Sequence, residues 1–351
     1  MKYQGVINRY RPLIDLPKGT RAISLLEGNT PLIPVPSISE SLGGGFELYI
    51  KFEGLNPTGS FKDRGMTAAV SEAAYRGAKT VICASTGNTA AAAAAYGARA
   101  GMRSIVIIPE GKVASGKLAG AIAYGADVIQ IEGSFDDALS LVVQISEKHP
   151  IALVNSLNPY RLQGQKTAAF EICDVLGDSP DWLALPVGNA GNITAYWMGF
   201  KEYHQIKQTK LPRILGVQAA GAAPLVKGKP VDKPETIATA IRIGKPARGE
   251  EAVTAASESE GRIIAASDAE ILSAQQLLAS SGIWVEPASA AGIAGLKKEV
   301  ENGSIELNGK KVVGVCTGHG LKDPNIITDN FSSPRTIKAN LARLEEAIIR
   351  E

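Results

Sequence analysis

Residues 80–100 read TVICASTGNTAAAAAAYGARA and contain a complete strand, turn and helix signal. The first five residues form a short apolar run, the next five are polar around one glycine, and an alanine-rich run follows. A short apolar run is typical of a strand covered on both faces, and the alanines favour a helix. The segment therefore predicts a βα unit of the kind that builds parallel sheets.

The same alternation continues along most of the chain from residue 46 onward, so the predicted fold class is α/β. Candidate strands are 47–52, 80–84, 104–108, 127–131, 151–155, 182–186, 214–218 and 311–316. Candidate helices are 89–100, 135–147, 162–176, 269–280 and 288–300. We interpret the polar, Pro/Gly-rich stretch 221–260 as irregular structure, with 236–243 as a candidate cavity lining. The amphipathic run at 333–351 predicts a helix that packs within the subunit or between subunits.

Composition excludes several classes of protein. The 351 residues are 45% hydrophobic and 21% charged, which suits two lobes of moderate size. The net charge of +2 comes from 37 basic and 35 acidic residues spread along the chain, so we expect no nucleic-acid partner. No apolar stretch is long enough to cross a bilayer and residues 1–17 contain no apolar block, so we expect a soluble, cytoplasmic protein without a membrane partner.

The cysteines and histidines do not suggest a metal centre or a disulfide framework. There are three of each, widely separated, at Cys83, Cys173, Cys316, His149, His204 and His319. Their number and spacing match neither a CxxC site nor a histidine cluster. We therefore expect buried reduced thiols and no metal.

One lysine follows a turn-forming run. Lys62 comes directly after NPTGSF (residues 56–61) and just before a predicted helix. Lysines at helix starts are usually solvated, and that is the simplest interpretation of this segment alone. A lysine at such a junction within an apolar lobe can instead have a depressed pKa and attack a carbonyl cofactor.

Three polar, glycine-containing segments follow predicted strands. Hydroxyls and free amides in 85–89 are suited to a carboxylate at a helix start, and the two glycines of 188–192 let successive amides converge on a phosphate. The third segment is 317–323. Each alone is compatible with an ordinary βα turn. Their occurrence together with Lys62 indicates a cofactor site.

These motifs resemble those of the fold-type II pyridoxal-phosphate enzymes, and specifically of the threonine synthases. The matching segments are EGNTPL (27–32), NPTGSFKDRG (56–65), STGNTAAA (85–92), GNAGN (188–192), EPASAA (286–291) and TGHGLKD (317–323). The lysine motif and EPASAA also resemble dehydratases and sulfhydrylases, so they indicate the cofactor class. GNAGN and TGHGLKD discriminate more sharply, because threonine and serine dehydratases usually have a longer glycine run at the phosphate cup.

The resemblance implies a two-lobed fold like that of the tryptophan synthase β subunit, with helices flanking parallel sheets and the cofactor between the lobes. The large cofactor-binding domain would comprise 1–60 and 155–351, and 61–154 would form a smaller mobile domain. A homodimer is usual in this family.

The resemblance also implies individual roles around pyridoxal 5'-phosphate. Lys62 is the expected Schiff-base lysine and catalytic base, Asn88 the expected partner of the ring hydroxyl oxygen, and Thr317 the residue facing the pyridine nitrogen. A neutral hydroxyl stabilises a protonated ring nitrogen less than a carboxylate would, so the electron sink is milder. The cofactor phosphate is expected at Gly188, Asn189, Ala190, Gly191 and Asn192.

The implied activity is that of a carbon–oxygen lyase. It converts O-phospho-L-homoserine and water to L-threonine and phosphate by β,γ-elimination and replacement. Residues implied for the substrate carboxylate are Ser85, Thr86, Asn88 and Thr89. Those for its phosphate are Ser156 and Arg161 foremost, with Asn189 and Lys117 as additions and Lys112 as an alternative to Lys117. A guanidinium fork suits a dianion.

Two other functions stay open on the sequence. A threonine or serine dehydratase would use the same lysine but needs no pocket for a substrate phosphate. A noncatalytic amino-acid or phosphate-binding protein could retain the scaffold, since fold does not imply activity. Keto acid release separates the first from a threonine synthase, and a cofactor absorbance band argues against the second.

Overall fold

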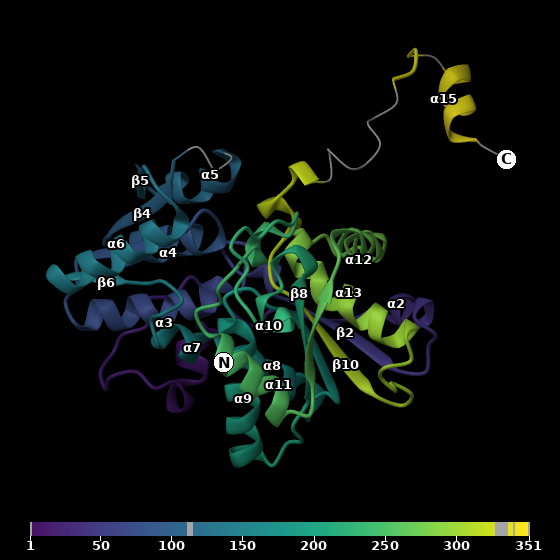
Figure 1. Ribbon diagram of the computed structural model, residues 1–351, viewed down its shortest axis with the longest axis horizontal. Coiled ribbons are helices and arrows are strands. Elements are labelled where there is room, and N and C mark those ends of the chain that lie inside the picture. Colours follow the sequence, from purple (N-terminus) through teal and green to yellow (C-terminus); the bar gives the residue numbers. More distant parts are fainter. Residues whose placement is uncertain (1, 111–114, 327–335, 340, 350–351) are drawn as a thin grey trace.

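The computed structural model describes residues 2–110, 115–326, 336–339 and 341–349, and it contains two open α/β sheets with helices on both faces (Figure 1). The larger sheet has the strand order β1-β2-β10-β7-β8-β9, and the smaller has the order β5-β4-β3-β6. Only β1 and β2 pair antiparallel; the other neighbours are parallel. The predicted α/β class is confirmed.

The larger sheet carries its core on both faces. Its strands are β1 (Leu32–Pro34), β2 (Glu47–Phe52), β7 (Trp182–Pro186), β8 (Arg213–Ala219), β9 (Arg262–Ala266) and β10 (Lys311–Cys316). One face is covered by α1 (Val6–Arg9), α8 (Thr167–Leu176), α9 (Gly191–Lys207) and α11 (Gly249–Glu258). The other is covered by α2 (Pro36–Ser41), α12 (Asp268–Ser280) and α13 (Pro287–Glu301). Two-sided cover explains why these strands are continuous apolar runs.

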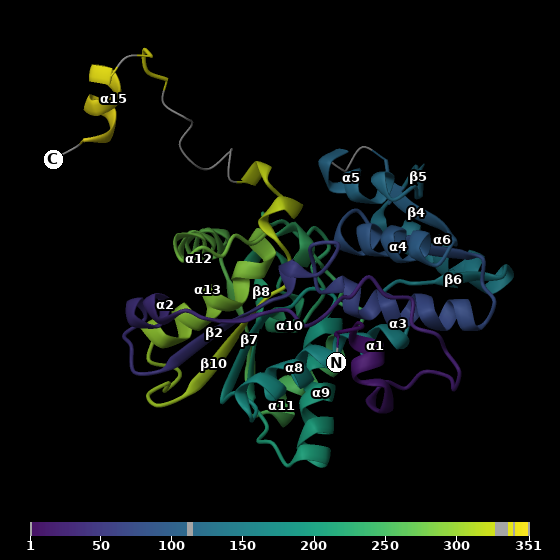
Figure 2. The ribbon, with the colours of Figure 1, turned by 180° about the vertical axis from the view of Figure 1, so that it is seen from behind.

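The smaller sheet consists of β3 (Thr80–Ala84), β4 (Arg103–Pro109), β5 (Asp127–Ile131) and β6 (Ile151–Leu153). Its core packs against α3 (Lys62–Tyr75), α4 (Asn88–Arg99) and α5 (Ser115–Ala123), and α6 (Phe135–Lys148) covers the opposite face. Six consecutive alanines of α4, residues 90–95, are buried, and their small side chains let this helix lie close to the strands. Figure 2 shows the N-terminal α1 beside α3.

Four buried charges join the helix that begins at Lys62 to the larger sheet. Arg64 contacts Glu53 at 2.6 Å and Glu171 at 2.7 Å, and Lys51 contacts Glu171 at 2.8 Å. Burial alone raises the pKa of Glu171, but Arg64 and Lys51 reverse that effect and lower it to about 2. Two cations therefore neutralise two anions, and the cluster Lys51, Glu53, Arg64 and Glu171 has no net charge.

Three sequence expectations need correction. The predicted helix 162–176 is divided into α7 (Tyr160–Gln165) and α8, with Lys166 between them. The stretch 221–260 is not wholly irregular, because it contains α11, whose buried Ala252, Ala255 and Ala256 give only a weak apolar signal. Strands β1 and β9 were not predicted. The remaining short elements are α10 (Pro224–Lys227) and 3-10 turns at Arg11–Leu13, Glu53–Leu55, Ala220–Ala222, Thr239–Ile241 and Gly320–Lys322.

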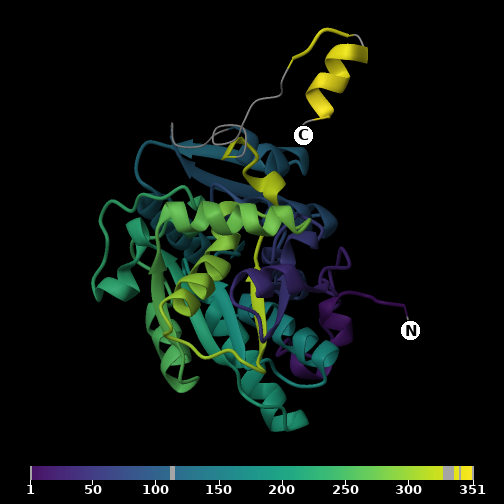
Figure 3. The same ribbon diagram turned by 90° about the vertical axis from the view of Figure 1, so that its right-hand side faces the viewer.

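The predicted C-terminal helix is present as α15 (Leu341–Ile348), but none of its side chains is buried against the other described residues. Its Leu341, Leu344 and Ile348 are exposed, as is Ile337 before it. Figure 3 shows α15 apart from both sheets. Predicted residues 333–335, 340 and 350–351 lie outside the described residues.

Cys83, Cys173 and Cys316 are buried and unpaired. Within the described part of the chain, no helix combines the length and the apolar character that a bilayer crossing requires.

Candidate active site

Lys62 is the first residue of α3, and its surroundings depress the pKa of its amine. The side chain is partly buried, with Nζ 4.3 Å from the centroid of the Phe61 ring. Burial and the nearby Arg161 guanidinium together lower the pKa of Lys62 to about 7, against the opposing effect of Glu286. A substantial fraction of this amine is therefore neutral at pH 7 and able to attack a carbonyl.

The loop before Lys62 is attached to the segment that follows β10. The Phe61 amide donates to the Thr317 carbonyl at 2.9 Å, and the His319 amide donates to the Gly59 carbonyl at 2.9 Å. Ser60 and Gly318 form the antiparallel bridge between them. The lysine loop and the predicted 317–323 loop are thus one small two-stranded structure.

A close crossing of α3 and α7 brings Arg161 near Lys62. A Cβ on Gly164 would lie 1.8 Å from the Arg64 carbonyl oxygen, and one on Gly65 would lie 2.7 Å from Gln165 Nε2. Glycine at both positions therefore lets the two helices touch through their backbones. Because Arg161 stands on α7, this contact sets its distance from Lys62.

Arg161 is a buried cation that lacks a carboxylate partner among the described residues. It is 2% exposed, its Nη1 donates to the Val154 carbonyl at 3.2 Å, and its Nε has no partner in that set. Burial lowers its pKa to about 10. A buried guanidinium without a counter-ion is suited to an anionic ligand.

The predicted carboxylate loop lies where β3 ends and α4 begins. Ser85, Thr86, Asn88 and Thr89 are all partly buried there, and Asn88 Nδ2 donates to Glu286 Oε1 at 2.8 Å. Asn155 bonds both the amide and the carbonyl of Ala84 at 2.9 Å, so the loop lies beside the segment that leads to Ser156 and Arg161.

The predicted phosphate cup follows β7 and leads into α9. Ala190 has a φ of +66°, and among the described residues no side chain caps the helix. Asn192 Nδ2 is buried and also lacks a partner there. Free amides at the start of a 17-residue helix, together with this unpaired donor, fit a phosphate. Gly188 lies against Ile241, so the predicted lining stretch 236–243 packs on the cup.

Thr317 is buried at the end of β10, next to the end of β7 in the sheet. Its hydroxyl oxygen lies 2.8 Å from Ser289 Oγ, which also accepts from the Gly318 amide at 2.7 Å. Ser289 and Glu286 belong to the EPASAA motif, which indicates the cofactor class, and neither was predicted as a site residue. The sequence did contain a signal for them, because both are polar residues at the start of a predicted helix.

Ser156 and Asn189, two of the positions predicted for the substrate phosphate, both contact residues 247–248, which belong to no predicted motif. Arg248 Nε donates to the Ser156 carbonyl at 3.3 Å, and the Ala247 amide donates to Asn189 Oδ1 at 3.4 Å. Residues 247–248 therefore connect two predicted substrate-phosphate positions. Lys117 is on α5 but its side chain, like all of Lys112, lies outside the described residues.

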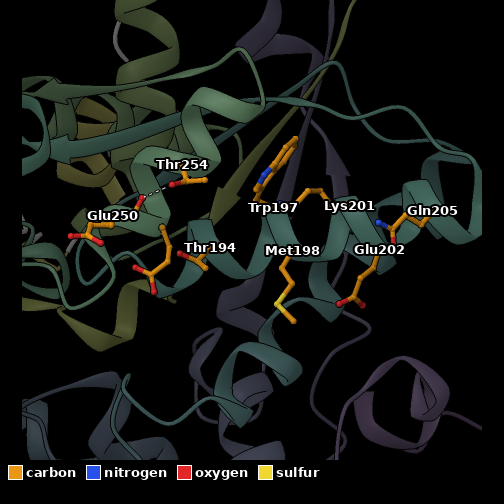
Figure 4. Close-up of a pocket in the computed structure, with 9 residues that line it drawn as sticks. Thr194, Trp197, Met198, Lys201, Glu202, Gln205, Glu250 and Thr254 are labelled. Carbon is orange, nitrogen blue, oxygen red and sulfur yellow. Dashed lines mark hydrogen bonds between the residues drawn. The ribbon is translucent and has the colours of Figure 1, made fainter.

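A separate surface groove lies between α9 and α11 (Figure 4). Its volume is about 590 Å³, and its lining includes Trp197, Met198, Glu202, Glu250 and Thr254. None of the predicted site residues lines it, so it is not the candidate active site.

The candidate site thus combines a lysine of lowered pKa with separate places for two anionic groups. The cup at 188–192 suits the phosphate of a cofactor, and Asn88 and Thr317 present polar side chains from two other strand ends. In a parallel sheet such strand ends are the usual place for a ligand. These residues fit a phosphate-bearing carbonyl cofactor such as pyridoxal phosphate.

Similarity to proteins of known function agrees with this chemistry. Residues 23–318 match the family described as "Pyridoxal-phosphate dependent enzyme". Threonine synthase of Synechocystis sp. is 57% identical over 97% of this chain and 88% of its own length. Threonine synthase of Halalkalibacterium halodurans is 59% identical over 92% of this chain and 91% of its own, and that of Methanocaldococcus jannaschii is 49% identical over 97% and 86%.

Solved structures show the same architecture. Threonine deaminase isoform 2 from Solanum lycopersicum superposes with a TM-score of 0.71 at 25% identity, covering 85% of this chain and 81% of that one. Maize serine racemase has a TM-score of 0.75 at 21% identity, covering 92% and 94%. The fold-type II architecture and the pyridoxal-phosphate cofactor are thereby confirmed. The chain belongs to the pyridoxal-phosphate dependent enzymes and, within them, to the threonine synthase family.

Proposed function

We propose that this protein is a threonine synthase that converts O-phospho-L-homoserine and water to L-threonine and phosphate. The observation that carries the proposal is the buried guanidinium of Arg161 beside Lys62, without a carboxylate partner among the described residues. The cup at 188–192 is suited to the cofactor phosphate, so Arg161 is available for a second, substrate-borne phosphate. A dehydratase acting on threonine would have no use for such a cation.

Lys62 carries the proton transfers in this proposal. Pyridoxal phosphate, when bound, supplies a carbonyl that amines attack and an electron sink for the substrate's Cα. Because burial and Arg161 lower its pKa to about 7, Lys62 can take the Cα proton at neutral pH and return protons as phosphate leaves from Cγ and water adds at Cβ.

The other assignments divide the site by the charge that each part recognises. Ser85, Thr86, Asn88 and Thr89 hold the substrate carboxylate at the start of α4. Ser156, Arg161, Asn189 and Lys117 hold the substrate phosphate. Asn88 would hold the cofactor at its ring oxygen, and Thr317 would hold it at its pyridine nitrogen. The cup would hold the cofactor phosphate through Gly188, Asn189, Ala190, Gly191 and Asn192.

Domain closure protects the reaction in this proposal. Residues 1–60 and 155–351 form the large cofactor-binding domain, and 61–154 form the smaller mobile domain. Closure excludes stray water, which would otherwise hydrolyse an enamine of the substrate to a keto acid.

The assembly and compartment belong to the same proposal. The protein acts as a homodimer in the cytoplasm. The exposed apolar side chains Leu341, Leu344 and Ile348 support association, and three buried unpaired cysteines suit a reducing compartment. Light scattering of the purified protein and fractionation of cells test the two parts separately.

The decisive experiment assays threonine, phosphate and 2-oxobutanoate from phosphohomoserine and from threonine. We expect threonine and phosphate in equal amounts from phosphohomoserine, and little keto acid from either substrate. Arg161→Leu should raise KM for phosphohomoserine at least about 100-fold, since charge-assisted bonds are the strong ones, and change cofactor affinity far less. Arg103→Leu, which removes an exposed ion pair with Asp127, is the matched control. Keto acid as the main product from threonine would establish a dehydratase instead.

A further inference from the structure

We propose that Glu286 is a positioning residue of the active site, where its carboxylate fixes the Asn88 side chain. The inference rests on the proposed function only for the identity of the cofactor beside Asn88.

The carboxylate is held where α4, α13 and the 317–323 loop meet. Glu286 is 5% exposed, its amide donates to the Gly318 carbonyl at 3.2 Å, and its Oε1 accepts from Asn88 Nδ2 at 2.8 Å. A Cβ on Gly318 would lie 2.2 Å from that same Oε1. The absence of a side chain at Gly318 therefore makes room for the Glu286 carboxylate.

The carboxylate is not used to build the helix that it precedes. Glu286 is the N-cap residue of α13, yet its side chain makes no capping hydrogen bond in the described part of the chain. N-cap side chains usually accept from the second or third helical amide. Here the buried carboxylate points instead to Asn88, which begins a helix of the other sheet.

This contact determines which end of the Asn88 amide faces Glu286. Glu286 Oε1 accepts this hydrogen bond, so the NH2 group of Asn88 points toward the carboxylate and its amide oxygen points away. The bond to Glu286 is the one side-chain hydrogen bond that Asn88 makes to the described residues. Without it, the amide is free to rotate or flip, and the hydrogen bond expected at the cofactor's ring oxygen loses its fixed partner.

The same carboxylate interacts electrostatically with the catalytic lysine. Burial raises the pKa of Glu286, the bond to Asn88 and the charge of Lys322 oppose that rise, and the resulting pKa is about 7. Asp323 raises it and Lys62 lowers it. In return Glu286 raises the pKa of Lys62, against the effects of burial and Arg161. The charged groups around Glu286 are therefore Lys62 on α3 and Lys322 and Asp323 in the 317–323 loop.

The test uses three variants of the full chain. Glu286→Gln keeps the shape and removes the charge, and Glu286→Asp keeps the charge but shortens the reach to Asn88. Glu299→Gln is the matched control, because Glu299 is also buried on α13 but pairs with Arg262. The first readout is the pH dependence of Lys62 labelling by an amine-reactive reagent in cofactor-free protein, located by peptide mass. The second is the affinity for pyridoxal phosphate with its visible absorbance.

We expect Glu286→Gln to move the midpoint of Lys62 labelling to lower pH, because the group that supports the lysine's charge is gone. Glu286→Asp should leave the midpoint close to wild type. Glu286→Asp should bind the cofactor about tenfold more weakly with an altered visible band, since it loses the buried hydrogen bond to Asn88. Glu286→Gln, whose amide oxygen can still accept from Asn88, should bind the cofactor with an affinity closer to wild type. Glu299→Gln should match wild type in both readouts.

An unchanged cofactor affinity and visible band in folded Glu286→Asp would overturn the inference, and so would an unchanged midpoint of Lys62 labelling in folded Glu286→Gln. An equal shift in Glu299→Gln would also overturn it, because loosening of α13 would then explain both. If circular dichroism shows that Glu286→Gln does not fold, the cofactor affinity of Glu286→Asp decides whether the inference holds. Failure of the wild type to bind pyridoxal phosphate or form threonine would instead contradict the proposed function, which is a separate result.

Discussion

Arg64→Met isolates the contribution of the buried four-charge cluster. Methionine keeps much of the side-chain length and removes the charge. Arg64 donates to Glu53 at 2.6 and 2.8 Å and to Glu171 at 2.7 and 3.0 Å. After the substitution Glu53 keeps, among the residues that the structure describes, side-chain bonds from Thr30 at 2.7 Å and Asn56 at 3.0 Å, and the cluster has one anion in excess.

The expected loss of stability is large because the remaining charge cannot reach water. Removing one partner of a buried ion pair typically costs about 3–5 kcal/mol, against a total stability of about 5–15 kcal/mol. Adding Glu53→Gln restores neutrality, since the Lys51–Glu171 pair at 2.8 Å is untouched. We therefore expect the double variant to regain about 1–3 kcal/mol relative to Arg64→Met alone.

Urea unfolding of the cofactor-free proteins, followed by tryptophan fluorescence and circular dichroism, measures these differences. Arg103→Met is the control, because its 63% exposed side chain forms a surface pair that should contribute less than about 1 kcal/mol. A loss below about 1 kcal/mol for Arg64→Met, or strict additivity in the double variant, would refute the idea of a coupled cluster.

The remaining predictions concern the active site. Gly164→Ala places a Cβ 1.8 Å from the Arg64 carbonyl oxygen, so we expect the free energy of unfolding in urea to fall by about 1–3 kcal/mol. Because Arg161 should move away from Lys62, we also expect the midpoint of Lys62 labelling to rise to higher pH. An unchanged midpoint would contradict this link. Thr317→Asp should favour protonation of the cofactor ring, altering the visible spectrum and slowing threonine formation about tenfold or more in stopped-flow assays; an unchanged spectrum in loaded, folded protein would count against it. Burial raises the pKa of Asp63 to about 7, so its stabilising effect is complete below about pH 4 and is lost as the pH rises to about 7. Asp63→Asn should therefore lose less stability than wild type between pH 5 and 7, and parallel curves would show that Asp63 does not titrate there.

Local pattern was enough to predict most strands and helices. The run at 182–186 is buried at every position, and the predicted bounds agree with β7. The failures have a physical cause in each case. Lys166 interrupts the predicted helix 162–176 because α7 must cross α3 at Gly164, a contact made with residues about a hundred positions earlier. Helix α11 is held by small alanines, which give little periodic contrast.

The polar contacts of the site were harder to foresee because they join distant parts of the chain. Asn88 and Glu286 are 198 residues apart, and Lys51 and Glu171 are 120 apart. Neither pair leaves a local pattern. The motifs identified Asn88 as a site residue, but only the folded arrangement reveals that Glu286 is its partner.

The bridge between the lysine loop and the 317–323 loop has a consequence for protein synthesis. Strand β10 is the last strand in the sequence, yet it lies between β2 and β7 in the larger sheet. Until residues 311–323 have emerged from the ribosome, β2 lacks its parallel neighbour. The hydrogen bonds from Phe61 to Thr317 and from His319 to Gly59 cannot form before then. Contacts over such sequence separations form late and slowly. A nascent chain therefore contains Lys62 long before the pocket around it can assemble. The surroundings that lower the pKa of this amine are in place only after residues 311–323 have been made.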